Sequence, residues 1–402
     1  MSGQGDPFEA SAAAVGYLFQ LRQALSFCVE QLATGLDWSV AVEAGDDIEV
    51  RRDDATSLWQ LKHRAPGTKL TDAATDLWKS IRIWATVLPD WDTQYERPAF
   101  FLLTTAHAPD GSAAYYLRPP GTASVRDEAK ALQLLHEARA ASSNKALRLS
   151  FEAWDKLEPQ QRIDLLARIQ VLDTAPDIDQ TTALLNGRAV LAVGHDKASA
   201  FLQRLDGWFL QRVTAMLRDR AVGPVTGLEF DQVFTDRRNQ FRPDNLPIDT
   251  DIIDLEAGGD DRAGQTFVRQ LGLTGVGDVR IRRAIRDFLR AFAQRSRWSN
   301  DNLLRPGELG TYERRLVEEW ETRFDIMVDE LGEDAAEDDK RREARAIYAW
   351  VEREARIPIR PGCDEPFVTK GSYQLLADDL RVGWHPDFVA RLMTLLEPVD
   401  SR

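Results

Sequence analysis

The chain has 402 residues, of which 43% are hydrophobic and 29% charged, and its net charge at pH 7 is -14. This composition is typical of a globular protein, the length favours two or three domains, and no apolar run is long enough to predict a membrane-spanning helix. The negative charge argues against a protein that coats nucleic acid along its whole surface, although a local basic cleft could still bind DNA.

The N-terminal segment MSGQGDPFEASAAA is acidic and polar, which is not the pattern of a signal peptide. The two cysteines, Cys28 and Cys363, lie far apart in the sequence and predict a protein of the reducing cytoplasm without a disulfide framework. The five histidines are scattered and make no zinc-ligand spacing with these cysteines.

The first part of the chain has the apolar periodicity of an α/β domain. Apolar residues at helical spacing predict helices at 12–32 and 71–90, the second ending near Pro89. Apolar segments of strand length lie at 38–44, 47–50, 57–63 and 99–105. The expected order is therefore helix, three strands, helix and strand, with the polar segment 51–56 as the turn between the second and third strands.

After the last of these strands the sequence becomes mostly helical in pattern, and long amphipathic segments begin at about residue 197. Residues 105–125 are rich in Pro, Gly and Ala and predict a loop, and 125–195 read as mostly helical. We expect 1–196 to form an α/β domain and 197–402 a mostly α-helical domain. Long amphipathic patterns predict helices of the second domain at 198–220, 279–297, 308–331 and 340–355.

A candidate site lies in the hairpin of the first domain. Side chains alternate along a strand, so Gln60 and Lys62 share one face of the strand SLWQLKH. Trp59 and Leu61 share the other face and can pack against helices. Asp47 opens the neighbouring strand, and a hairpin would bring it beside Gln60.

These residues have the chemistry of a magnesium site. The carboxylates of Asp47 and Glu43 and the carbonyl of Gln60 are oxygen ligands that suit a hard divalent cation. Lys62 would lie within reach of a metal-bound water or a scissile phosphate. A locally basic neighbourhood could bind a phosphate backbone, and its candidate DNA-binding residues are Arg51, Arg52, His63, Arg64 and Lys69.

A solvated, salt-bridged surface hairpin is the alternative interpretation, and chemistry and spacing alone slightly favour it. Two details point the other way. The strand around Gln60 and Lys62 is strongly apolar, which places the pair inside the sheet, and the basic neighbourhood is unusual in an acidic protein.

The first half also resembles a known family. An acid, then Asp, then Gln-x-Lys after a hairpin is similar to the pattern of restriction-endonuclease-like nucleases in the variant where Gln replaces the usual acid. The segments GYLFQ, E-x-x-DDIEV, WQLKHR and LWKSIRIW resemble the nuclease domain found on SAVED-type effectors and on nuclease subunits of ABC three-component antiphage systems, including Lamassu.

The second half resembles the same systems. The segments FRPDNLPID, LVEEWETRF, GSYQLLADD and VGWHPDF are similar to the C-terminal domain of three-component-system proteins. The resemblance therefore covers nearly the whole chain and implies a Lamassu-type nuclease subunit. It implies an α/β restriction-endonuclease-like domain followed by a helical domain for assembly.

The resemblance also implies roles for single residues. Asp47 would be a metal ligand, Glu43 a second or outer ligand, Gln60 would take the place of the usual acid, and Lys62 would be the catalytic lysine. Gln20 matches a helix glutamine near the site in this family. Asp46 is the alternative to Asp47, because sequence does not separate adjacent acids, and the number of metal ions stays open.

The implied activity is that of an endonuclease that cuts double-stranded DNA with Mg²⁺, for which Mn²⁺ could substitute. The implied partners are an ATPase of the structural-maintenance-of-chromosomes type, which senses DNA, and a small accessory subunit. Release from these partners and self-association would activate the nuclease. Two alternatives stay open: a nuclease gated by a cyclic oligonucleotide, and a non-catalytic scaffold subunit with a degenerate nuclease fold.

The arginine-rich helix predicted at 280–297 also has more than one interpretation. Its apolar stripe predicts that one face packs on the domain while the arginines point elsewhere. The arginines could contact DNA or an acidic partner subunit, or they could pair with the acids of this chain as a solubilising face. The sequence slightly favours the last of these interpretations.

Overall fold

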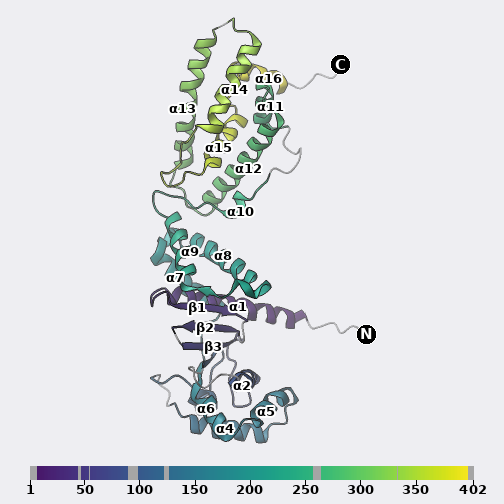
Figure 1. The fold of residues 1–402 in the computed structure, drawn as a ribbon, viewed down its shortest axis with the longest axis vertical. Helices are drawn as coiled ribbons and strands as arrows, with labels where there is room; N and C mark the ends of the chain where they lie inside the picture. The colour runs from purple at the N-terminus through teal and green to yellow at the C-terminus, as the bar shows by residue number, and fades with distance from the viewer. Residues whose placement is uncertain are drawn as a thin grey trace, which may run out of the picture. The chain divides into compact units, whose positions relative to one another are not determined.

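The computed structural model describes residues 7–43, 47–53, 55–88, 98–121, 126–256, 264–332 and 334–396. The chain divides into two compact units (Figure 1). The first comprises Met1–Ala192 and Phe201–Thr235, and the second comprises Val193–Ala200 and Asp236–Arg402. Among the described residues, no helix combines the length and apolar character needed to cross a bilayer.

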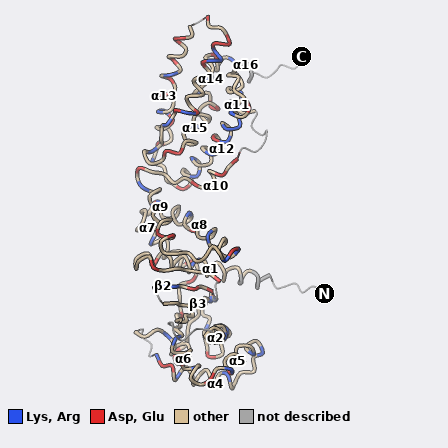
Figure 2. Tube along the Cα trace, viewed as in Figure 1, with Lys and Arg blue, Asp and Glu red and all other residues tan. Residues whose placement is uncertain are grey.

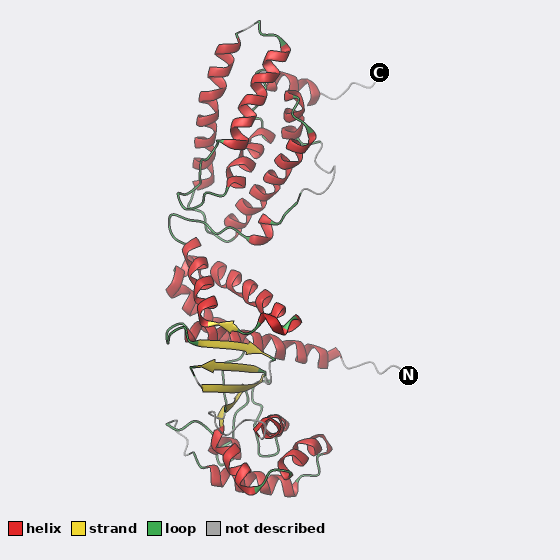
Figure 3. Cartoon of the chain, in the orientation of Figure 1, coloured by secondary structure: helices red, strands yellow, loops and turns green. Residues whose placement is uncertain are grey.

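A six-stranded mixed sheet forms the centre of the first unit (Figure 3). The strands are β1 (Trp38–Val42), β2 (Ile48–Arg52), β3 (Ala55–Lys62), β4 (Ala99–Thr104), β5 (Ile169–Leu172) and β6 (Val225–Thr226). Their order across the sheet is β5-β4-β3-β2-β1-β6. β1, β2 and β3 form an antiparallel meander, β3, β4 and β5 run parallel, and β6 is antiparallel to β1.

Helices precede and connect these strands. They are α1 (Pro7–Gln31), α2 (Thr75–Val87), α3 (Ala113–Tyr116), α4 (Glu128–Ala141), α5 (Arg148–Asp155), α6 (Pro159–Arg168), α7 (Ile178–Val193), α8 (Ala198–Arg218) and α9 (Gly227–Gln240). The predicted order of helix, three strands, helix and strand is confirmed as α1-β1-β2-β3-α2-β4. The parallel β3-α2-β4 connection follows from the need to bury both faces of a parallel strand pair.

The two faces of the sheet bury different aromatic clusters. On one face, Leu58 and Phe100 join the core beneath α2, where Trp84 stacks on Phe100 with ring centroids 5.4 Å apart. On the other, Trp59 stacks on Phe101 at 4.1 Å. Trp59 also packs against α1, as its direction along the strand predicts, so the neighbouring polar positions belong to the α2 face.

Residues 201–235 pack with the sheet, although the sequence predicts a domain boundary at 196. The Arg22 guanidinium on α1 donates to both carboxylate oxygens of Asp206 on α8, at 2.7 and 2.8 Å. Val225 of β6 pairs with Val40 of β1. At Gly227 a Cβ atom would lie 2.3 Å from a backbone oxygen, so only glycine permits this close approach. The first unit therefore continues into α9.

The second unit is mostly helical, as predicted (Figure 3). Its helices are α10 (Thr250–Ile253), α11 (Thr266–Thr274), α12 (Asp278–Asn300), α13 (Glu308–Leu331), α14 (Glu337–Arg353), α15 (Pro366–Asp378) and α16 (Phe388–Leu396). Helices α12 and α15 cross closely at Gly371, where a Cβ atom would lie 2.0 Å from the backbone oxygen of Asp287. Basic and acidic residues are distributed along all of the longer helices (Figure 2).

Ion pairs hold the helices of this unit together. Arg360 is 5% exposed, and its guanidinium donates to both carboxylate oxygens of Glu308 at 2.7 Å. It also donates to the backbone oxygens of Asn245 and Leu303. A buried guanidinium is tolerated only when its donors are satisfied in this way.

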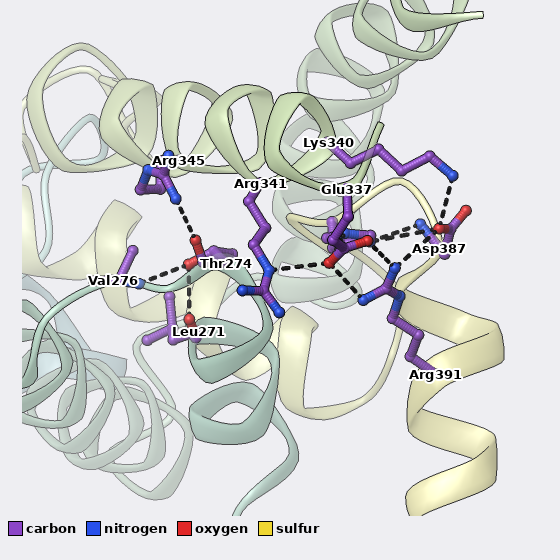
Figure 4. A network of polar contacts seen from close by, with 10 residues as sticks. Leu271, Thr274, Val276, Glu337, Lys340, Arg341, Arg345, Asp387 and Arg391 are labelled. Atoms are coloured by element: carbon purple, nitrogen blue, oxygen red, sulfur yellow. Dashed lines mark hydrogen bonds and ion pairs between the residues drawn. The ribbon is translucent and has the colours of Figure 1, made fainter. Parts of the chain in front are cut away.

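A second polar network joins α14 to the start of α16 (Figure 4). Glu337 accepts hydrogen bonds from Arg391 and, at 2.9 Å, from Arg341. Asp387 accepts from the Lys340 ammonium at 3.1 Å. His385 is fully buried beside this network and accepts a hydrogen bond from the Asp387 backbone N–H, which makes it a packed structural residue.

Candidate functional site

The candidate site lies at one end of the sheet, where β1 and β3 end and β2 begins. The register pairs Ile48 with Trp59, so Asp47, directly before β2, lies opposite Gln60 of β3. Lys62 is the last residue of β3. The hairpin register therefore brings one carboxylate to two polar side chains of the third strand.

Hydrogen bonds join these residues into one cluster. The Lys62 ammonium donates to Oδ2 of Asp47 at 2.9 Å, and the backbone N–H of Leu61 donates to the same oxygen at 2.7 Å. Nε2 of Gln60 donates to Oδ1 of Asp47 at 3.3 Å. Gln60 is 3% exposed, and the side chains of Asp47 and Lys62 are 14% and 17% exposed. The cluster is thus half-buried rather than part of a solvated surface hairpin.

Glu43 adds a second carboxylate close to this cluster. Its backbone N–H donates to the carbonyl oxygen of Asp47 at 3.1 Å, and its φ angle of 57° lies in the left-handed region. Non-glycine residues rarely adopt this conformation, and those that do cluster at functional sites. Burial and then the charge of Asp47 raise the pKa of Glu43, while the charge of Lys62 lowers it.

Two neighbouring residues were not predicted from the sequence. Burial and the charge of Glu43 raise the pKa of Tyr17 on α1, so this phenol lies near the acidic end of the cluster. The fully buried hydroxyl of Thr104 donates to the carbonyl oxygen of Lys62 at 3.1 Å and accepts from the N–H of Ala106. The signal for Thr104 was its position at the polar end of an otherwise apolar strand.

Gln20 and Asp46 were predicted as auxiliary site residues, and the structure describes only the first of them. Gln20 lies half-buried on α1, and its side chain makes no hydrogen bond to any residue that the structure describes. Asp46, the sequence alternative to Asp47, lies outside the described residues. Of the two adjacent acids, Asp47 is the one whose contacts the structure describes.

The predicted DNA-binding residues separate into two groups. Arg51 and Arg52 lie at the far end of β2, about 15 Å along the strand from Asp47, given ~3.3 Å per residue. Arg51 donates to Glu49 at 2.5 Å, and Arg52 lies 3.9 Å from Asp53. These two arginines are thus at the opposite end of the hairpin from the cluster.

The other three follow Lys62 at the site end. The guanidinium of Arg64 donates to Asp76 on α2 at 2.6 and 2.5 Å, and this hydrogen bond raises the pKa of Arg64. The ring of His63 lies 5.2 Å from that of Phe19. Lys69 is exposed. Arg64 thus ties β3 to α2, and Lys69 offers a charge at the surface.

The donor set fits a hard divalent cation. Among the described residues, no group of three or more His, Cys, Asp or Glu side chains is placed to hold a metal ion, so a site here depends on an oxygen of Gln60. Rotation of its amide would turn Oε1 toward Asp47, and amide orientations of this kind are assigned from hydrogen bonding. The charge of Asp47 raises the pKa of Glu43 and so the cost of ionising it, which a bound cation would offset; two carboxylates with an amide oxygen beside them match the ligands of Mg²⁺.

Comparison with known proteins addresses the second unit. Residues 267–392 match the family model of C-terminal domain 7 of the ABC-three component (ABC-3C) systems. The matched region runs from α11 into α16 and contains LVEEWETRF, GSYQLLADD and VGWHPDF, while FRPDNLPID precedes it. Neither the curated proteins nor the solved structures gave a match to the chain. The chain is thus similar to ABC-three component proteins in its C-terminal region, which supports its membership of such a system.

Proposed function

We propose that this chain is the nuclease effector of an ABC-three component antiphage system and that its first unit cuts double-stranded DNA. The observation that carries the proposal is the convergence of Asp47, Gln60 and Lys62 at one end of the sheet. The match of residues 267–392 to the C-terminal domain of these systems supports the defence context. The element order α1-β1-β2-β3-α2-β4 is compatible with a restriction-endonuclease-like domain.

Each residue of the cluster has a task in this proposal. A bound Mg²⁺ would polarise the scissile phosphate and lower the pKa of a coordinated water. Asp47 and Gln60 would supply oxygen ligands, with Glu43 as a further or outer ligand. Lys62 would position the attacking water or stabilise the charge that develops on the phosphate. The hydrogen bond from Lys62 to Asp47, at 2.9 Å, supports a role for the ammonium beside the proposed metal ligands.

Substrate binding would use the positive charges at the site end of the hairpin. Lys69 is exposed there, and His63 and Arg64 follow directly after Lys62. A net charge of -14 weakens DNA binding by a single chain, so self-association of several sites would strengthen it. We therefore propose that an ATPase of the structural-maintenance-of-chromosomes type and an accessory subunit restrain the chain until foreign DNA is sensed, after which the chain assembles.

The central experiment compares wild type with Lys62→Ala on duplex DNA, with Mg²⁺ or Mn²⁺ and with or without the partner subunits. Lys156→Ala is the matched control, because Lys156 is exposed at the end of α5 in the same unit. Cleavage by wild type and the control, together with a loss of at least a hundredfold in a folded Lys62→Ala chain, is the expected result. Equal cleavage by all three proteins would refute the role of Lys62.

A scaffold role makes the opposite prediction. If wild type and both variants leave DNA intact under every condition while still assembling with the partner subunits, the proposal of a nuclease fails. Metal binding by calorimetry gives an independent readout, since wild type should bind Mn²⁺ and Asp47→Asn should bind it more weakly.

A further inference from the structure

The second unit has a basic pocket that the proposed nuclease chemistry does not use. It has a volume of about 950 Å³ and lies among α12, α14 and α15. Six basic side chains line it, against three acidic ones, in a chain whose net charge is negative. A recess lined mostly by one sign of charge concentrates the electrostatic field and attracts oppositely charged ligands.

The structure already assigns partners to some of these cations. Arg280 donates to Glu352 at 3.1 Å, and Arg290 donates to the backbone oxygen of Leu255 at 3.0 Å. The guanidinium of Arg283, by contrast, is exposed and makes no hydrogen bond or ion pair with any described residue. The arginine-rich helix α12 is therefore partly an internal ion-pair helix, as the sequence favoured, and partly a source of unused charge.

Two buried polar atoms in the pocket lining lack hydrogen-bond partners. Gln374 is 2% exposed, and its Oε1 accepts no hydrogen bond from the described residues. The Nε of Arg286 is likewise buried and donates to none of them. An unmade hydrogen bond of a buried group costs about 1–3 kcal/mol, so a ligand that supplies these bonds would be favoured here. The Oε1 atom of Gln374 is an acceptor, and the Nε atom of Arg286 is a donor.

The helix crossing at Gly371 builds this pocket. Because glycine lets α15 approach the backbone of α12 at Asp287, Lys370 and Gln374 on α15 lie against the arginines of α12. Asp287 lies among these cations, and burial raises its pKa while Lys370 and Arg286 lower it. The three carboxyl groups of the lining are therefore too few to neutralise its six cations.

We propose that this pocket binds a small ligand that carries two or more phosphate groups, such as a nucleotide. Guanidinium groups bind phosphate oxygens with paired, charge-assisted hydrogen bonds, and several unpaired cations in one recess require several anionic groups. The volume lies within the range of about 300–1,000 Å³ that is usual for small-molecule sites. The Oε1 of Gln374 would accept a hydrogen bond from a sugar hydroxyl or a base amine.

An acidic segment of a partner protein is the competing occupant. Stable protein interfaces bury about 800 Å² on each partner and spread over a broad surface. A recess among three helices, with its unpartnered polar atoms inside, favours a compact ligand instead.

Isothermal titration calorimetry of the full chain with ATP, inorganic tripolyphosphate and a poly-glutamate peptide tests the proposal. We expect one ATP per chain and weaker binding as ionic strength rises. Arg283→Ala should weaken binding about tenfold, as loss of one charged hydrogen bond implies. Arg282→Ala is the matched control, because Arg282 is the exposed neighbour on α12 outside the pocket lining; it should bind as wild type does.

Binding of tripolyphosphate as well as ATP would show that the phosphates suffice, and binding of ATP alone would show that the nucleoside is also recognised; both support the proposal. Two results would overturn it: no saturable binding of either phosphate compound, or equal weakening by Arg282→Ala and Arg283→Ala. Saturable binding of poly-glutamate alone would identify an acidic protein partner instead. Lys62→Ala should bind ATP normally, so the proposal stands or falls separately from nuclease activity.

Discussion

The two units use ionic groups in different ways. In the first, hydrophobic faces on both sides of the sheet provide the core, and the Asp47–Lys62 pair lies at the strand ends, where packing does not require it. In the second, pairs such as Arg360–Glu308 connect segments that are distant in sequence, and their atoms are buried within the fold. Removal of the Asp47–Lys62 charges should therefore change chemistry, whereas removal of a pair that connects distant segments, such as Arg360–Glu308 or Arg22–Asp206, should change stability.

The largest expected effect is on stability. Arg360→Ala should lower the free energy of unfolding by about 3–5 kcal/mol, because it leaves the carboxylate of Glu308 buried without its partner. Urea unfolding followed by circular dichroism measures the change. Arg314→Ala on the exposed face of α13 is the control and should change stability by less than about 0.5 kcal/mol. Similar losses in both variants would remove the contrast between the units.

Asp47→Asn should reduce activity strongly while changing stability only slightly. We expect DNA cleavage to fall by at least about a hundredfold, since the variant loses the charge that would hold a metal ion. The free energy of unfolding should fall by only about 1 kcal/mol, because the amide can still accept from the N–H of Leu61. A folded variant with wild-type cleavage rates would contradict the assignment of Asp47.

The next largest effect is expected on stability, at the crossing of α12 and α15. Gly371→Ala should destabilise the protein by about 1–3 kcal/mol, since the new methyl group would lie 2.0 Å from the backbone oxygen of Asp287. The same substitution at Gly272 on α11 meets no atom within 4 Å and should be neutral or stabilise by up to ~1 kcal/mol. The unfolding temperature should therefore fall for Gly371→Ala and stay unchanged or rise for Gly272→Ala, and equal shifts would refute the close crossing.

The smallest effect is a dependence on pH. The hydrogen bond from Arg391 lowers the pKa of Glu337 from 4.5 to about 2. A lowered pKa in the folded state stabilises the protein above pH 4.5, and this contribution is lost as the pH falls toward 2. Arg391→Ala should cost less than about 1 kcal/mol at pH 6, because the pair is largely exposed.

The difference between wild type and Arg391→Ala should shrink when unfolding is repeated at pH 3. Arg314 donates to the hydroxyl of Thr311 and to none of the carboxylates that the structure describes, so Arg314→Ala should show the same small difference at both pH values. If the free energies of unfolding of wild type and Arg391→Ala differ by the same amount at pH 6 and pH 3, Glu337 does not titrate in this range.

Local patterns predicted much of the first unit. Apolar segments of strand length and helical spacing predicted the order of elements from α1 to β4, and side-chain alternation placed Gln60 and Lys62 on one face. Hairpin pairing then implied the approach of Asp47, because the turn fixes which residues face each other. These features depend on residues close together in the sequence.

Features that depend on distant residues were not predictable. The two-residue strand β6 is too short to have a period, and its pairing with β1 joins segments far apart in the sequence. Thr104 gains its role only because β4 lies beside β3. In α12 the sequence showed the arginines but could not distinguish Arg280, which pairs with Glu352, from Arg283, which does not. Such differences arise from tertiary packing.

The added strand β6 also limits how this protein can be recombined with its relatives. An exchange of modules at residue 196 would remove β6 and leave the backbone groups of β1 exposed at the edge of the sheet, where strands of other molecules can pair. It would also separate Arg22 from Asp206. A module exchange that keeps the first unit intact therefore has to include the chain as far as α9, so α8 and α9 belong to the exchanged segment.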